Sequence, residues 1–173
     1  IYDWERDSQG NLVNYNGYPK QSDYQSVIGY EYPDWIWGWT NTVTYKNFTL
    51  SFTLDGRVGG MAHSKTNQAM WNSGAHIDSD NQWRYDEVVN KKTNFVGSGV
   101  KVVSGSVDYD SNGKIIHDNR VFAPNDVQVS YESYMKSTNP YIGTVTRQNV
   151  FDETFFKLRD LSLSYQTVSY THL

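Results

Sequence analysis

Hydrophobic and polar residues alternate through two neighbouring segments, residues 35–45 and 48–59, which read WIWGWTNTVTY and FTLSFTLDGRVG. Successive side chains of a β-strand point to opposite faces. A period of two therefore places aromatic and aliphatic side chains on one face and mostly Thr and Ser on the other. Only Lys46 and Asn47 separate the two segments. The pattern predicts a β-hairpin with one apolar face.

A third alternating segment, residues 154–166, reads TFFKLRDLSLSYQ. Its apolar face contains Leu161, Leu163 and Tyr165, and strict alternation continues that face through Lys157 and Arg159. If these strands cross a membrane, their apolar face contacts lipid tails, and two cations are unexpected on it. We therefore expect them at the outer headgroup level, where long cationic side chains can snorkel or pair with lipopolysaccharide phosphates.

The remaining residues have the character of connecting segments. Residues 1–34 are polar and rich in Gly, Asn and Tyr, which predicts a loop. Residues 60–152 are too long for a simple hairpin loop, and we interpret them as a long extracellular loop. Within it we expect weak helices in 63–92, a small hairpin that turns at Asn112-Gly113, and a further short helix in 122–140.

A soluble antiparallel sheet would show the same alternation, because it also has one buried face. Three details favour membrane strands instead. A strand of about 11 residues, tilted by about 45°, covers about 25 Å, the height of an outer-membrane apolar band. The connecting turn is very short, and aromatic residues occupy both ends of the apolar face. The residues expected at the two membrane interfaces are Trp35, Trp37, Tyr45, Phe48 and Tyr165.

The composition limits the class of function. Aromatic residues make up 16% of the chain and charged residues only 20%. Aromatic rings among uncharged polar residues suit a sugar-binding β protein or a membrane barrel. The formal charge of −4, without a basic block, leaves no electrostatic footprint for nucleic acid. The chain has no Cys, which excludes disulfides and thiolate metal sites.

Two stretches resemble a known family, the SusC/RagA TonB-linked outer-membrane proteins. Residues 27–60 carry the stretch VIGYEYPDWIWGWTNTVTYKNFTLSFTLDGRVGG, and FFKLRDLSLSY at 155–165 is similar to a late strand of that family. Residues 70–90 and 120–126 are similar to a large extracellular insertion of one branch. The matching elements of the first stretch are Ile28-Gly29, Pro33, Tyr45-Lys46-Asn47-Phe48, Leu50-Ser51 and Gly59-Gly60.

The resemblance implies a function as well as a fold. Members form a 22-stranded barrel with an N-terminal plug and a TonB box, in the outer membrane of Gram-negative, Bacteroidetes-like bacteria. They import oligosaccharides, peptides or other large nutrients with a SusD-like surface lipoprotein and with TonB. The fold class expected here is therefore all-β: a few antiparallel strands of a transmembrane barrel, with a long extracellular loop. The resemblance implies neither an enzymatic activity nor a cofactor.

We expect residues 1–167 to be part of the C-terminal barrel domain of a longer chain, because residue 1 is Ile and no signal peptide is visible. The last six residues, 168–173, read VSYTHL. One back-translation, GTC TCT TAT ACA CAT CTN, reproduces a transposon adaptor used in sequencing libraries. We therefore expect residues 168–173 to be adaptor read-through.

Loop aromatics are the candidate ligand-binding residues, because an aromatic ring can stack on the face of a sugar. Packing of the loop's own small core, or of a SusD-like lid, explains such residues equally well. The candidates, taken only as a group, are Trp71, Trp83, Tyr85, Tyr131 and Tyr134.

Catalytic and metal-binding motifs are weak. The four His residues lack metal-ligand spacing. The stretch DYDSNGK at 108–114 resembles the front of a calcium loop, but its twelfth position is Asn119 rather than Glu, which favours a plain Asn-Gly turn. The acidic pairs Asp86-Glu87 and Asp152-Glu153 are adjacent in sequence, so each pair points to opposite faces of a strand and not into one cleft. No catalytic residue is assigned. A soluble carbohydrate-binding β-sandwich is the alternative function. A glycoside hydrolase fragment is a third function, which the sequence supports less.

Overall fold

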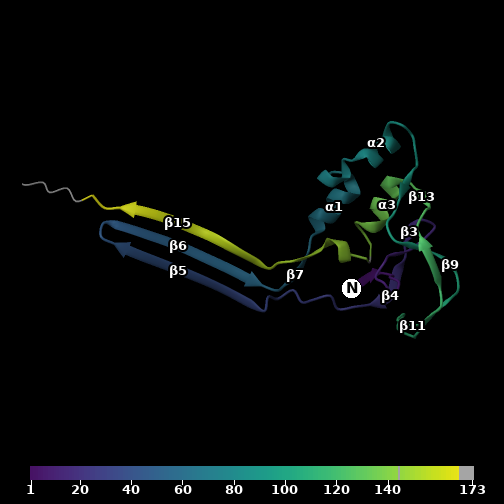
Figure 1. The fold of residues 1–173 in the computed structure, drawn as a ribbon, viewed down its shortest axis with the longest axis horizontal. Coiled ribbons are helices and arrows are strands. Elements are labelled where there is room, and N and C mark those ends of the chain that lie inside the picture. Colours follow the sequence, from purple (N-terminus) through teal and green to yellow (C-terminus); the bar gives the residue numbers. More distant parts are fainter. Residues whose placement is uncertain (144, 168–173) are drawn as a thin grey trace, which may run out of the picture. The chain divides into compact units, whose positions relative to one another are not determined.

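The computed structural model describes residues 1–143 and 145–167. The chain is mostly β, with 45% of residues in strands and 18% in helices, and it forms two compact units (Figure 1). We call the described residues 29–62 and 152–167 the sheet unit, and the described residues of 1–28 and 63–151 the mixed unit. Residues 168–173 lie outside the described residues, so their origin as adaptor read-through stays a prediction.

The sheet unit contains three long antiparallel strands in the described residues. They are β5 (Trp35–Tyr45), β6 (Phe48–Val58) and β15 (Phe155–Tyr165), in the order β15-β6-β5. These strands lie where the alternation predicts them. Sequence order and spatial order agree, so the sheet is an up-and-down meander. The sheet is open, and none of the sheets in the described residues closes into a barrel.

The hairpin between β5 and β6 turns at Lys46 and Asn47. Tyr45 pairs with Phe48 across it, and Lys46 has a φ of 52°. The Asn47 side chain donates a hydrogen bond of 2.8 Å to the Gln166 carbonyl, and the Gln166 amide donates one of 2.8 Å to the Asn47 carbonyl. The turn is therefore joined to the end of the third strand, and the three strands end in one row.

A β-bulge at Arg159 corrects the prediction for the third strand. Leu158 pairs with Leu54 and Asp160 with Thr53, so Arg159 is the extra residue in β15. The bulge shifts the alternation by one residue. Phe156 and Leu158 therefore continue the apolar face, whereas Lys157 lies opposite Asp55 on the polar face.

The expected position of two cations on the apolar face is thus wrong. The Arg159 Nε donates a hydrogen bond of 2.8 Å to the Asp55 carboxylate on the polar face, and the Lys157 ammonium lies 4.5 Å from the centre of the Phe155 ring. Strict alternation could not place them, because a bulge leaves no periodic mark in the sequence.

Disulfide trapping tests this register, because the chain contains no Cys of its own. Leu54 and Leu158 pair directly and share a face. We expect cysteines at these two positions to form a disulfide under mild oxidation, measured by a mobility shift on non-reducing gels. The matched control replaces Leu54 and Lys157 with cysteines. These two side chains lie on opposite faces of the sheet, so the pair should stay unlinked. Preferential linkage of the control pair would contradict the bulge.

The mixed unit combines short strands with three helices. A four-stranded sheet has the order β12-β9-β2-β3, and its β2–β9 pairing is parallel. Three two-stranded pairings accompany it, β1 with β4, β8 with β13 and β10 with β11. At the sequence boundaries of the two units, β7 (Met61–His63) pairs with β14 (Val150–Asp152). The other strands are β1 (Tyr2–Trp4), β2 (Val13–Tyr15), β3 (Tyr18–Pro19), β4 (Gln21–Gln25), β8 (Phe95–Val96), β9 (Val100–Ser104), β10 (Val107–Tyr109), β11 (Ile115–Asp118), β12 (Val121–Pro124) and β13 (Gln128–Val129).

The helices are α1 (Lys65–Ser73), α2 (Gln82–Val88) and α3 (Tyr131–Thr138), with 3-10 turns at Ile77–Ser79 and Arg147–Asn149. Each helix begins after a residue whose side chain accepts a hydrogen bond from a first-turn amide. These N-caps are Ser64, Asn81 and Ser130. The helices lie in the predicted ranges, and the predicted small hairpin is β10–β11.

Residues 1–34 do not form the plain loop that their composition predicts. They contain β1 to β4, and β2 pairs with β9 more than 80 residues later, for example Val13 with Val100. Strands of two to five residues are too short to show a period of two. The buried side chains confirm that residues 1–28 belong to the mixed unit, because its core combines Trp4 and Val13 with Val129, Tyr131, Tyr134 and Val145.

Candidate functional site

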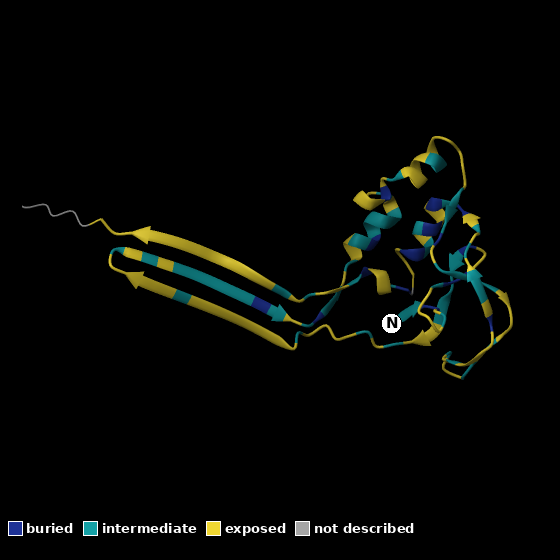
Figure 2. Ribbon diagram, in the orientation of Figure 1, coloured by how far each residue is buried: buried dark blue, intermediate teal, exposed yellow. Residues whose placement is uncertain are grey.

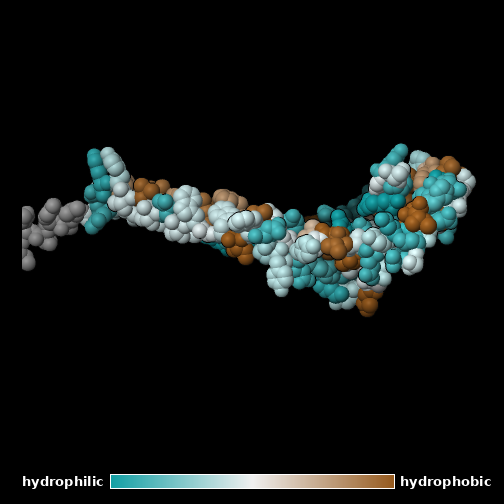
Figure 3. Space-filling model, turned by 90° about the horizontal axis from the view of Figure 1, so that it is seen from below, coloured by the Kyte–Doolittle hydropathy of each residue, from teal (hydrophilic) through white to brown (hydrophobic). Residues whose placement is uncertain are grey.

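The most distinctive surface is one face of the sheet unit, which we call the apolar face. Figure 2 shows β5 and β15 exposed along almost their whole length, with β6 half-buried between them. In Figure 3 hydrophobic side chains lie at the surface along the sheet. The register places on the apolar face Trp35, Trp37, Trp39, Asn41, Val43 and Tyr45 of β5, Phe48, Leu50, Phe52, Leu54, Gly56 and Val58 of β6, and Phe156, Leu158, Leu161, Leu163 and Tyr165 of β15.

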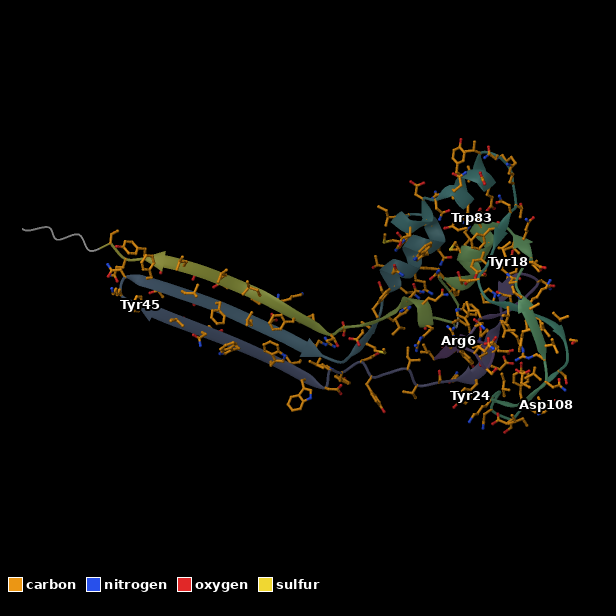
Figure 4. The ribbon with its side chains drawn as sticks, in the orientation of Figure 1. Arg6, Tyr18, Tyr24, Tyr45, Trp83 and Asp108 are labelled. Atoms are coloured by element: carbon orange, nitrogen blue, oxygen red, sulfur yellow. The ribbon has the colours of Figure 1, made fainter. Side chains whose placement is uncertain are left out.

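One row of aromatic rings crosses the apolar face at the hairpin end. Tyr45, Phe48 and Tyr165 are direct neighbours across the three strands, and the Phe48 and Tyr165 ring centres lie 4.7 Å apart. Figure 4 shows Tyr45 beside the turn. All three residues were expected at a membrane interface, and the structure aligns them in one row.

A second aromatic row crosses the opposite end of the face. Trp37, Gly56 and Phe156 are direct neighbours, with the Trp37 and Phe156 ring centres 5.4 Å apart. Gly56 leaves space for the indole, since a Cβ there would lie 2.5 Å from the Trp37 ring. Trp35 ends the face, 72% exposed. The sequence prediction missed Phe156, because the bulge places it here.

The middle of the apolar face, between the two rows, holds six aliphatic side chains and one aromatic pair, Trp39 and Phe52, whose ring centres lie 5.4 Å apart. Leu161 is 61% exposed and Leu163 is 70% exposed. Asn41, opposite Phe52, is the one strongly polar side chain of the face. An exposed apolar surface of this extent marks a protein or membrane contact and not ordinary solvent-facing surface.

Six hydroxyl groups on the polar face of the same sheet pair across the strands. Three cross-strand pairs lie in consecutive register, Thr40 with Thr53, Thr42 with Ser51, and Thr44 with Thr49, at oxygen–oxygen distances of 3.2, 2.9 and 3.2 Å. Ion pairs occupy the end away from the hairpin. They are Arg159–Asp55 at 2.8 Å and Arg57–Glu153 at 2.5 Å.

The loop aromatics do not form one ligand surface. Tyr131 and Tyr134 are buried, each 6% exposed. Both pack against Phe95, with ring centres 5.2 and 4.9 Å away, and Trp83 contacts Phe95 edge-on at 5.6 Å (Figure 4). Tyr131 and Tyr134 therefore pack the core of the mixed unit, as the alternative explanation proposed, whereas Trp83 is 43% exposed.

The other two loop aromatics lie on α1 and α2. Tyr85 on α2 is 54% exposed. Trp71 on α1 is half-buried and stacks on His76, with ring centres 4.3 Å apart and planes 13° apart. Trp71 also lines a cleft of about 480 Å³ among the three helices, together with Tyr131.

A buried ionic cluster in the mixed unit was not predicted. The Glu5 carboxylate contacts the Arg120 guanidinium, and the two side chains are 2% and 1% exposed. Lys20 approaches Glu5 at 3.0 Å, the Tyr109 hydroxyl donates to Glu5 at 2.8 Å, and Arg120 pairs with Asp118 at 2.7 Å. Burial alone would raise the pKa of Glu5, but hydrogen bonds from Arg120, Tyr109 and Lys20 outweigh it and hold that pKa below its ordinary value.

The side chains most able to ligate a metal in the described part of the chain are those of His, Asp and Glu, since the sequence has no Cys. Residues 1–143 and 145–167 contain no cluster of three His, Asp or Glu side chains able to hold a metal ion. Asp110 closes the β10–β11 turn, where its carboxylate accepts hydrogen bonds from the amides of Asn112 at 2.8 Å and Lys114 at 2.9 Å. This arrangement is the Asn-Gly turn that the sequence favoured over a calcium loop.

In the described residues, no helix has the length and apolar character needed to cross a membrane.

No protein-family model matches the chain, and no curated protein matches it. The likeness of its strands to SusC/RagA proteins therefore remains a prediction.

Proposed function

We propose that the sheet unit is part of the wall of an outer-membrane β-barrel. The barrel is that of a TonB-dependent importer of oligosaccharides or other large nutrients, which works with a SusD-like surface lipoprotein. One observation carries the proposal: three 11-residue strands form a meander whose exposed apolar face is bordered by an aromatic row at each end. Aromatic rings are favoured at both lipid–water interfaces, and aliphatic side chains are favoured between them.

The strand length fits this role. Eleven residues at about 3.3 Å each, tilted by about 45°, cover about 25 Å of membrane. The polar face suits a barrel lumen, because it carries cross-strand hydroxyl pairs and ion pairs, which are favoured beside water or other protein groups. The free outer edges of β5 and β15 would pair with neighbouring strands of the complete barrel.

The connections suggest an orientation. The two-residue turn at Lys46 and Asn47 is typical of the short periplasmic turns of such barrels, whereas the opposite end of β6 leads into residues 59–152. We therefore assign the hairpin end to the periplasm and the mixed unit to the extracellular side. The resemblance to SusC/RagA proteins supports the importer, its lipoprotein partner and its use of TonB.

The alternative, a soluble carbohydrate-binding β-sandwich, requires a second sheet against the apolar face. Such packing would bury the inner side chains at the density of a protein core. The exposures of Leu161 and Leu163 are those of uncovered side chains. The barrel wall explains these exposures with lipid as the covering medium.

Detergent dependence tests the proposal. We expect the purified chain to precipitate without detergent and to be monomeric in micelles, measured by size-exclusion chromatography with light scattering. Replacing Val43, Leu50, Leu161 and Leu163 with Thr should remove most of the detergent requirement, because it removes the apolar middle of the face.

The matched control places four substitutions on the polar face instead, with Thr40, Thr42, Thr44 and Thr49 changed to Ser. This variant should need detergent as the unmodified chain does. A monomeric chain that is soluble without detergent would overturn the barrel assignment and favour the soluble module.

A further inference from the structure

Helices α1, α2 and α3 of the mixed unit line a cleft of about 480 Å³ (Figure 1). This volume lies within the range of about 300–1,000 Å³ that is usual for small-molecule sites. Trp71 of α1, Val88 of α2 and Met135 of α3 supply apolar lining. All lining residues belong to the mixed unit, so a ligand of the cleft does not depend on the barrel wall proposed for the sheet unit.

The charged side chains of the cleft carry an excess of one positive charge. The three cations and two anions that line it are Arg84, Lys91, Lys136, Glu87 and Glu132. Lys136 forms an ion pair with Glu132. Arg84, Lys91 and Glu87 keep their charges, since none of them has an ion-pair partner in the described part of the chain. Three positive and two negative charges leave a net charge of +1, which complements a ligand with a single negative charge.

The Arg84 guanidinium, which lines the cleft, has a free edge. Its Nη1 donates hydrogen bonds to the Gly74 carbonyl at 2.8 Å and to the Ser79 hydroxyl at 3.1 Å. Its Nε and Nη2 have no hydrogen-bond partner among residues 1–143 and 145–167. A carboxylate binds such an edge through two parallel N–H···O bonds. Because Nη1 is already anchored, the side chain is restrained before the ligand binds.

The Glu87 carboxylate is engaged at the start of α3 and not by Arg84. One of its oxygens accepts a hydrogen bond from the Ser130 hydroxyl at 2.5 Å, and the other accepts one from the Glu132 amide at 3.2 Å. Lys91 adds a second cation to the lining of the cleft. A ligand carboxylate can therefore bind both cations without displacing a protein carboxylate.

The Trp71 indole gives the cleft a fixed aromatic wall. His76 stacks on it, with ring centres 4.3 Å apart and planes 13° apart, so the protein itself holds the ring. A fixed aromatic ring binds a second ring at little cost in side-chain entropy. The thioether of Met135 adds a group that contacts aromatic rings favourably. The cleft thus combines a surface for a ring with an edge for a carboxylate.

We infer that the cleft among α1, α2 and α3 binds an aromatic monocarboxylate. Its carboxylate makes a two-point contact with the Nε and Nη2 groups of Arg84 and is attracted by Lys91, and its ring lies against Trp71 and Met135. A neutral ligand would leave both cations unpaired, and a phosphate dianion carries one negative charge more than the excess charge of the cleft. This site is separate from the barrel wall, and its ligand is a small molecule instead of a large nutrient.

The test titrates the whole chain, in micelles of a non-ionic detergent, with naphthalene-2-carboxylate in an isothermal calorimeter, and empty micelles give the blank. We expect one saturable site with a Kd below about 1 mM at neutral pH. Naphthalene-2-carboxamide keeps the rings but not the charge, and it should bind at least about tenfold more weakly because the charge-assisted contact with Arg84 is lost. Acetate keeps the carboxylate but not the rings, and it should also bind at least about tenfold more weakly.

Three variants assign the contact to its residues. Arg84→Gln should weaken binding of naphthalene-2-carboxylate at least about tenfold and leave binding of the carboxamide nearly unchanged. Arg84→Lys keeps the charge but loses the two-point contact, so its affinity should lie between those of Arg84→Gln and the unmodified chain. Lys91 has no ion-pair partner to lose in the described residues, so Lys91→Gln should fold normally and weaken binding about threefold.

The matched control is Arg6→Gln. Arg6 is exposed, and its Nη1 donates to the Gly10 carbonyl at 2.9 Å, much as Nη1 of Arg84 donates to Gly74. Arg6 does not line the cleft, so this variant should bind naphthalene-2-carboxylate with unchanged affinity. Circular dichroism checks that each variant is folded.

Three results would overturn the aromatic-carboxylate site. They are no binding of naphthalene-2-carboxylate at millimolar concentration, equal affinity for the carboxylate and the carboxamide, and equal weakening by Arg84→Gln and Arg6→Gln. None of these results changes the detergent requirement that tests the barrel wall. Specific binding by a chain that needs no detergent would instead support this site and remove the barrel.

Discussion

Replacing Leu161 with Arg is expected to prevent stable membrane insertion of the sheet unit, under the proposal that this unit is part of a barrel wall. Leu161 lies at the middle of β15, opposite Phe52, on the apolar face. An Arg near the bilayer midplane of a barrel costs about 2–4 kcal/mol. That cost is a large part of the total stability of a typical protein. Heat-modifiable mobility on gels and urea titration in lipid vesicles would measure the loss.

The adjacent residue provides the control. Ser162 lies opposite Ser51 on the polar face. Ser162→Arg should change the free energy of unfolding far less, because a polar face that lines a lumen, as proposed, admits charge. In a soluble protein with Leu161 in water, both substitutions would fall within about 0.5 kcal/mol of no effect. Equal effects of the two changes would therefore rule out a lipid-facing apolar surface.

The long strands could be predicted from sequence because their signal is local. In β5 and β6 every second residue over 11 positions is apolar except Asn41, and pairing in the hairpin follows from a two-residue turn. In β15 the same reasoning failed at Arg159. A bulge depends on how two strands pair, which the sequence of one strand does not contain. Because the bulge was not predicted, Phe156 was not predicted beside Trp37 in the second aromatic row.

The mixed unit shows the same limit more strongly. Its helices carry local signals, such as the N-caps Ser64, Asn81 and Ser130. The Glu5–Arg120 contact joins residues 115 positions apart, so no window of sequence contains both partners. Each of these residues alone resembles an ordinary surface charge. The cleft at Trp71 likewise depends on three helices that only the fold brings together.

Replacing Arg120 with Met is expected to destabilise the mixed unit by about 3–5 kcal/mol, because it leaves the buried Glu5 carboxylate without its main partner. Hydrogen–deuterium exchange of the β2 and β9 amides measures this locally, apart from the sheet unit. The control, Lys101→Met, removes a pair with Asp126 whose side chains are 34% and 68% exposed. It should cost no more than about 1 kcal/mol.

The same cluster predicts a dependence on pH. Hydrogen bonds from Arg120 lower the pKa of Asp118, and the pKa of Glu5 is also lowered in the folded protein. Both carboxyls bind protons more weakly when folded, so their stabilisation is complete above about pH 4.3 and is lost as the pH falls through the folded-state values. Arg120→Met removes the guanidinium that stabilises both anions. The amide protection of the Arg120→Met variant should therefore fall less steeply between neutral and acid pH than that of the unmodified chain. An equal slope would show that Arg120 does not hold these carboxylates ionised.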